Sequence, residues 1–180
     1  MKGVVFIKLL ELVEKDYGLA YVDDLIKNSM IASKGSYTTI GDYSALEMDR
    51  LLDHLSIKTS LTKDALLRWF GKYFFDSLKK RYSGLLNQYH DPIELIANVE
   101  NHINAESFKI YPKNKLPSFD LILKTKTTLE FICRSEIAMY SFGHSLIEKS
   151  FDHYGVRATI EIEKIKPDGT EVKFSILRNV

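Results

Sequence analysis

Five histidines and one cysteine are the side chains of this chain best suited to bind a transition metal. No two histidines stand four residues apart, so no helix can present a pair of them on one face, and no Cys/His cluster occurs. This spacing argues against a zinc site, and we predict no metal site of that kind. The histidines are His54, His90, His102, His144 and His153.

Nucleophilic chemistry has equally little support. Cys133 lies on a predicted strand with an apolar face, an environment that raises the pKa of a thiol and leaves it inert. A structural cysteine is the favoured interpretation, and a reactive thiol is the alternative. Ser135 lacks the Gly-x-Ser-x-Gly context of a hydrolase, and no phosphate-binding glycine loop occurs. We therefore predict that the chain is not an enzyme.

Short motifs along the chain carry a family resemblance. Residues 91–94 read Asp-Pro-Ile-Glu, a long helical stretch follows, and then come Tyr111-Pro112 and a Leu-Pro-Ser-Phe segment at 116–119. With the opening Met-Lys-Gly-Val-Val-Phe, this order resembles the haem nitric oxide/oxygen binding family, called H-NOX or HNOB, over essentially the whole chain. The resemblance implies the H-NOX fold, haem b as the cofactor and a non-catalytic role in nitric oxide sensing.

Two haem-binding motifs of that family are degenerate in this chain. The family's iron ligand is a histidine seven residues before Tyr-Pro; the matching residue is Asn104, and an amide is a poor iron ligand. The family's Tyr-x-Ser-x-Arg motif binds the haem propionates and aligns with Cys133, Ser135 and Ile137, so only its serine matches. Isoleucine cannot replace the charged fork of arginine. We therefore expect haem binding to be weak or absent.

Two neighbouring residues are candidate substitutes for the lost groups. His102 falls on a mostly polar stripe of its predicted helix, beside Glu106, so we interpret it as solvated. Arg134 alternates with Cys133 along a predicted strand, so it should point to the opposite face of the sheet. Neither residue is expected to restore haem binding.

Other positions that resemble the family's haem pocket are retained. Pro117 resembles a proline that presses on the haem, although an ordinary rigid turn is the alternative. Phe142 matches a tyrosine that stabilises oxygen in oxygen-binding members, so NO or CO would be the favoured ligand if haem were bound. Without haem, we expect Phe74, Phe108 and Phe142 or an apolar small ligand to fill the pocket. The distal wall positions are Val5, Leu9, Phe74, Phe142 and Leu146, all apolar.

The apolar periodicity predicts an α+β protein, with helices in the first 110 residues and a mixed region after them. Thr62 and Asp91 are candidate N-caps, and Glu94 could complete a capping box with Asp91. Gly18 and Gly155 suit helix ends, and Pro167-Asp168-Gly169 predicts a hairpin. Helices are predicted at 2–17, 20–29, 44–56, 63–81, 92 to about 111 and 136–154, and strands at 119–125, 128–135, 156–165 and 171–177, with irregular structure at 31–43.

An aromatic run on the predicted helix 63–81 has two interpretations. Core packing is the favoured one, and an aromatic wall around a planar ligand is the alternative. The run consists of Trp69, Phe70, Tyr73, Phe74 and Phe75.

Length and composition indicate one domain over residues 1–180, with a helical lobe at about 1–60 and a ligand-pocket lobe at about 61–180. The formal net charge of +1 gives no sign of a nucleic-acid or membrane partner. One cysteine suits the reducing cytoplasm, where we expect the protein. Stand-alone bacterial relatives in the resembled family act in trans, so the implied partner is a histidine kinase or a cyclic-dinucleotide enzyme.

Overall fold

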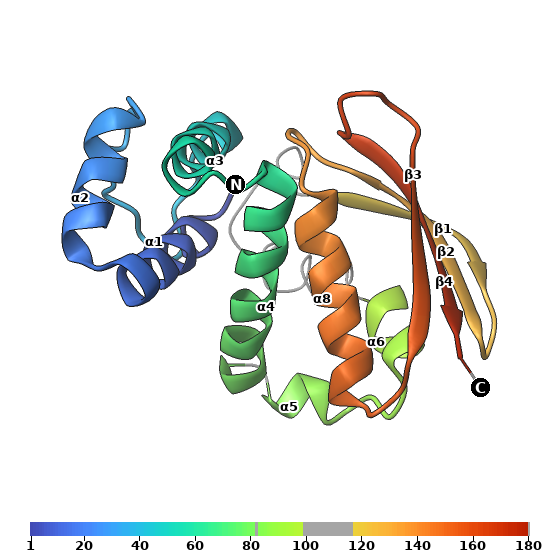
Figure 1. Ribbon diagram of the computed structural model, residues 1–180. Coiled ribbons are helices and arrows are strands. Elements are labelled where there is room, and N and C mark those ends of the chain that lie inside the picture. The colour runs from blue at the N-terminus through green and yellow to red at the C-terminus, as the bar shows by residue number, and fades with distance from the viewer. Residues whose placement is uncertain (82, 99–116, 180) are drawn as a thin grey trace.

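Four helices form the N-terminal half of the chain in the computed structural model, which describes residues 1–81, 83–98 and 117–179. Each matches a predicted helix to within three residues at both ends. Thr62 caps the last of them, since its Oγ1 accepts a hydrogen bond from the Ala65 amide at 3.2 Å. The helices are α1 (Gly3–Tyr17), α2 (Leu19–Asn28), α3 (Ala45–Thr59) and α4 (Lys63–Arg81) (Figure 1).

The second half combines short helices with an antiparallel sheet. The described elements are α5 (Ser83–Leu86), α6 (Pro92–Ala97), β1 (Ser118–Lys124), β2 (Thr128–Arg134), α8 (Tyr140–His153), β3 (Ala158–Lys164) and β4 (Glu171–Arg178). The sheet order is β1-β2-β4-β3, and every neighbouring pair is antiparallel. The predicted α+β class and all four strands are therefore confirmed.

Four details differ from the sequence-based expectations. Helix α5 was not predicted. The helix predicted from residue 92 to about 111 ends at Ala97, with Asn98 as its C-cap, and the rest of the predicted range lies outside the described residues. Helix α8 begins at Tyr140, because residues 135–139 run from the sheet to the helices and bury Ile137 on the way. Glu94 does not close the predicted capping box; its carboxylate pairs with Lys124 on β1 at 3.3 Å.

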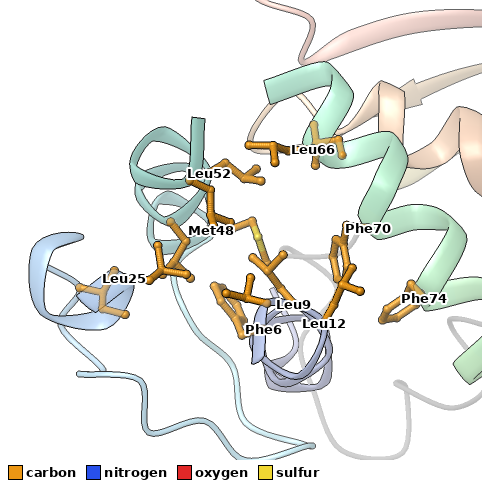
Figure 2. Packing of buried hydrophobic residues seen from close by; sticks show 14 of the residues in the cluster. Phe6, Leu9, Leu12, Leu25, Met48, Leu52, Leu66, Phe70 and Phe74 are labelled. Carbon is orange, nitrogen blue, oxygen red and sulfur yellow. The ribbon is translucent and has the colours of Figure 1, made fainter. Parts of the chain in front are cut away.

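Two apolar clusters stabilise the fold. One joins α1, α2, α3 and α4, with Phe6, Leu9 and Phe70 fully buried in it (Figure 2). The other lies between the sheet and helices α6 and α8, where Phe131 of β2 stacks on Phe174 of β4 with ring centroids 5.2 Å apart. Helix α8 packs against α4 on one side and against β3 on the other, so it connects the two clusters (Figure 1).

Candidate functional site

The five predicted distal wall positions come together in the structure. Helix α1 supplies Val5 and Leu9, α4 supplies Phe74, and α8 supplies Phe142 and Leu146. Leu9 and Phe74 belong to the first apolar cluster, and the other three pack against it. Residues up to 141 positions apart in the sequence therefore contribute to one apolar cluster, although their predicted role as the wall of a pocket remains a prediction.

Three phenylalanine rings of this cluster pack against one another. The Phe142 ring lies 5.1 Å from that of Phe70 and 5.3 Å from that of Phe74, and the latter two are 5.6 Å apart. These centroid distances fall in the favourable range for aromatic pairs. Phe70 was assigned only to the aromatic run, although its position four residues before Phe74 could have indicated the same helix face. Figure 2 shows the rings of Phe70 and Phe74 beside α1.

Ile137, the residue predicted to match the family's arginine, is an apolar core residue. Its side chain is 7% exposed and belongs to the first cluster. The Ser135 hydroxyl donates a hydrogen bond to the Ile137 carbonyl at 2.6 Å, and the Ser135 amide donates to the Thr170 carbonyl at 2.9 Å. These two hydrogen bonds of Ser135 therefore stabilise the bend that places Ile137 in the core.

Cys133 and Arg134 occupy opposite faces of β2, as the strand alternation predicts. Cys133 packs against the second cluster, and burial raises the pKa of its thiol to about 11. Arg134 forms salt bridges with Asp120 on β1 and Glu171 on β4 on the other face. The guanidinium is thus engaged away from the helices and cannot serve as a substitute propionate ligand in this arrangement.

The remaining predicted site residues divide into two groups. Pro117 is described and is exposed to solvent just before β1. Asn104, His102 and Phe108 lie outside the described residues. Their predicted roles remain predictions.

Polar contacts fix the α4–α8 interface beside the three rings. Asp64 on α4 accepts hydrogen bonds from the Tyr140 and Ser141 hydroxyls, both at 2.8 Å. One turn further along, Arg68 lies 3.1 Å from Nδ1 of His144. Burial, assisted by Arg68, lowers the pKa of His144, so its imidazole is neutral at pH 7 and accepts from the arginine.

The described residues do not fit a haem bound in the family's usual way. Within residues 1–81, 83–98 and 117–179, no group of three His, Cys, Asp or Glu side chains could hold a free metal ion. Haem iron needs only one axial protein ligand, and Asn104, the residue predicted to match that position, lies outside these ranges. The three motif positions offer a half-buried thiol, a hydroxyl already bonded to a carbonyl, and an isoleucine. None supplies the positive charge that two propionates require.

The sequence profile of one family, described as Haem-NO-binding (HNOB), matches residues 2–162. The chain belongs to this family. H-NOX domains are gas- and haem-sensing modules, generally without catalytic activity, and they signal to partner proteins such as kinases or cyclases.

Solved structures of other H-NOX proteins share the fold. The unliganded Fe(II) H-NOX protein from K. algicida is 46% identical, with 100% of this chain and 97% of that chain covered and a TM-score of 0.92. An H-NOX from Shewanella woodyi in the Fe(II)CO state is 28% identical, with coverage of 99% and 95% and a TM-score of 0.80. The Fe(II)NO protein from S. oneidensis is 16% identical, with full coverage of both chains and a TM-score of 0.86, and shows the fold alone.

No curated protein is a significant match to this chain. Across the described parts of the H-NOX fold, no helix is both long enough and apolar enough to cross a membrane.

Proposed function

We propose that this H-NOX domain is a non-catalytic regulatory module that signals to a partner protein in trans and works without haem. The observation that carries the proposal is the burial of Ile137 in the helical core, where the family's motif has an arginine. A haem at this place would bring two carboxylates toward an apolar side chain, and an unpaired buried charge costs about 3–5 kcal/mol.

The replacement of the iron ligand supports the same proposal. Asn104 stands where the family has its histidine, and a neutral amide binds iron far more weakly than imidazole. A protein that has lost both ligand and propionate clamp is expected to sense something other than a haem-bound gas.

The ring contacts support a pocket filled by the protein's own side chains. Phe70, Phe74 and Phe142 pack against one another at centroid distances of 5.1–5.6 Å. An apolar cavity left open would cost roughly 24 cal/mol per Å³, so aromatic filling offsets the loss of a large planar cofactor. An apolar small molecule is the other occupant compatible with this wall.

A second candidate function is a haem-b-dependent NO or CO sensor with weakened or substituted ligation. One observation favours it: the K. algicida protein, 46% identical over the whole chain, is an Fe(II) H-NOX protein. If haem binds here, Phe142 offers no hydrogen bond to a distal ligand, which favours NO or CO over oxygen.

The proposed partner is a histidine kinase or a cyclic-dinucleotide enzyme in the cytoplasm, following the family's general role in signalling to kinases and cyclases. Because no haem is required, NO should not change the activity of that partner in the presence of this domain.

Absorbance spectroscopy tests the proposal. The protein is expressed with added haem, purified and desalted, and its Soret band is measured. We expect no stoichiometric band. A full Soret peak that survives desalting would overturn haem independence, and His102→Ala would then show whether that histidine has taken over ligation, since its spectrum would change.

A further inference from the structure

The outer face of α3 carries an exposed stripe of four residues with an unusual symmetry. Leu46, Arg50, Asp53 and Ile57 are spaced by four, three and four residues, the spacing that aligns side chains along one helix face. The opposite face packs into the first cluster through Met48, Leu51, Leu52 and Leu55. The stripe therefore points to solvent, on the helical half of the molecule away from the sheet (Figure 1).

The two ends of the stripe are apolar and strongly exposed. Ile57 is 79% exposed and Leu46 is 60% exposed. Met30, which is 80% exposed, adjoins the stripe, because its carbonyl accepts a hydrogen bond from Nη1 of Arg50 at 2.7 Å. Burial of these three side chains would remove a substantial apolar area from water.

The charges between those ends are opposite and incompletely neutralised. Across the described parts of the chain, Arg50 forms no salt bridge, and its only hydrogen bond goes to the neutral Met30 carbonyl. Asp53 shares the single ammonium of Lys63 with Asp49, both at 2.7 Å, so this group keeps a net negative charge. The Asp53 side chain remains 57% exposed.

Along the stripe the side chains are apolar, positive, negative and apolar. This order is complementary to the same order read in the opposite direction. If two α3 helices pack antiparallel about a two-fold axis between residues 51 and 52, Leu46 meets Ile57 of the other copy. In the same register Arg50 meets Asp53, and each contact occurs twice. A two-fold interface needs this kind of self-complementary surface, and opposite charges that meet across an interface fix its register.

We propose that the occupant of this face is a second copy of the chain, bound as an antiparallel α3–α3 dimer. One helix of 15 residues per copy, with Met30 beside it, gives an interface at the small end of specific interfaces. The dimer is therefore reversible, with a dissociation constant of the order of micromolar or weaker. It leaves α8 and the three-ring region free, so the dimer does not depend on whether the protein binds haem.

Charge-swap variants provide the test, with dimerisation measured by sedimentation equilibrium. Arg50→Glu places like charges opposite Asp53, and Asp53→Arg places like charges opposite Arg50, so each variant alone should dimerise about tenfold or more weakly than the unaltered chain. Mixing the two variants restores both opposite-charge contacts, and a heterodimer should form with nearly the original affinity. Arg157→Glu, the same charge change at an exposed position before β3, is the matched control and should leave dimerisation unchanged.

The mixing experiment also controls for folding, because a misfolded variant cannot be rescued by its counterpart. Circular dichroism of each variant verifies this independently. A wild-type chain that stays monomeric up to millimolar concentration would overturn the proposal. So would equal dimerisation of the wild type and both single variants, which would locate the interface elsewhere, or mixed variants that stay monomeric while the wild type dimerises.

Discussion

At the scale of single residues, a buried carboxylate organises the segment between α2 and α3. Glu47 is 7% exposed and accepts hydrogen bonds from the Ser33 amide at 3.2 Å, the Ser33 hydroxyl at 2.5 Å and the Tyr37 hydroxyl at 2.8 Å. Tyr37 stacks in turn on Phe6 at a centroid distance of 4.4 Å. One charge therefore fixes a stretch that the sequence marks only as irregular.

Removal of this carboxylate should destabilise the fold. We expect Glu47→Ala to lower the free energy of unfolding by about 2–4 kcal/mol, because three donors lose a charged acceptor in a buried site. Urea denaturation monitored by circular dichroism measures the change. Glu14→Ala, on the exposed side of α1, is the control and should stay within about 0.5 kcal/mol of the unaltered chain. Equal stabilities of the two variants would refute this role of Glu47.

The raised pKa of the Cys133 thiol leads to a second prediction about a single residue. With a thiol pKa of about 11 instead of 9.0, the folded protein should react with iodoacetamide at pH 8 about a hundredfold more slowly than the urea-unfolded chain. The rate in the folded state should rise with pH up to about 11.

The same shift affects stability with a defined sign. The folded state holds the Cys133 proton more tightly, so this contribution is fully present below pH 9.0 and is lost as the pH rises to about 11. Cys133→Ser should remove most of that pH dependence between the two values. Equal alkylation rates for the folded and unfolded chains at pH 8 would show that the thiol is not buried.

At the scale of elements, the start of α1 is held by another part of the backbone. Lys2, the residue before the helix, makes no capping hydrogen bond through its side chain. Instead the Gly3 amide donates to the Gly41 carbonyl at 2.8 Å, and the Val4 amide donates to the Thr39 carbonyl at 3.2 Å. The segment before α3 thus satisfies amides that a helix leaves unpaired at its first turn.

This close approach explains the glycine at the start of α1. A Cβ atom on Gly3 would lie 2.1 Å from the Thr38 carbonyl oxygen, a backbone atom that cannot rotate away. We expect Gly3→Ala to cost about 1–3 kcal/mol by overpacking, measured as a lower urea midpoint. Gly84→Ala in α5 has no atom within 4 Å of its Cβ and should be neutral or slightly stabilising. A neutral Gly3→Ala would show that the segment relaxes freely.

At the scale of the whole molecule, α8 couples the sheet to the helical core. It contacts both α4 and β3, and the segment before it buries Ile137 among the helices. The fold that would present the family's motif positions is therefore retained, and we interpret Asn104, Cys133 and Ile137 as the residues that depart from the motifs. Replacing these three residues by those of the family's motifs should then give a protein that binds haem.

We expect the triple variant Asn104→His, Cys133→Tyr, Ile137→Arg to bind haem and show a Soret band. Without haem it should unfold at lower urea concentration, because the arginine at 137 enters an apolar cluster unpaired. Haem at about 100 times its dissociation constant should raise the free energy of unfolding of this variant by about 2.7 kcal/mol. The matched control keeps Asn104 and carries only the other two changes; it should bind haem much more weakly. A folded triple variant that stays colourless would show that the pocket has closed.

The sequence by itself determined the family, the α+β class and the nearly complete order of elements. The family followed from short motifs that resemble those of known members. The class and the order of elements follow from local signals: the caps at Thr62 and Asp91, the glycines at Gly18 and Gly155, with φ of 88° and 66°, and the strand alternation that separates Cys133 from Arg134. Such signals depend on neighbours along the chain, which the sequence displays directly.

Only the tertiary structure decided which distant groups meet. Nothing local indicates that Glu47 binds Ser33 and Tyr37, that Arg134 is held by Asp120 and Glu171, or that Ile137 joins the helical core. The late start of α8 has the same origin, since burial of Ile137 outweighs helix propensity before Tyr140. Long-range packing and buried charge contribute more free energy than propensity does, and they depend on neighbours in space that the order of residues does not reveal.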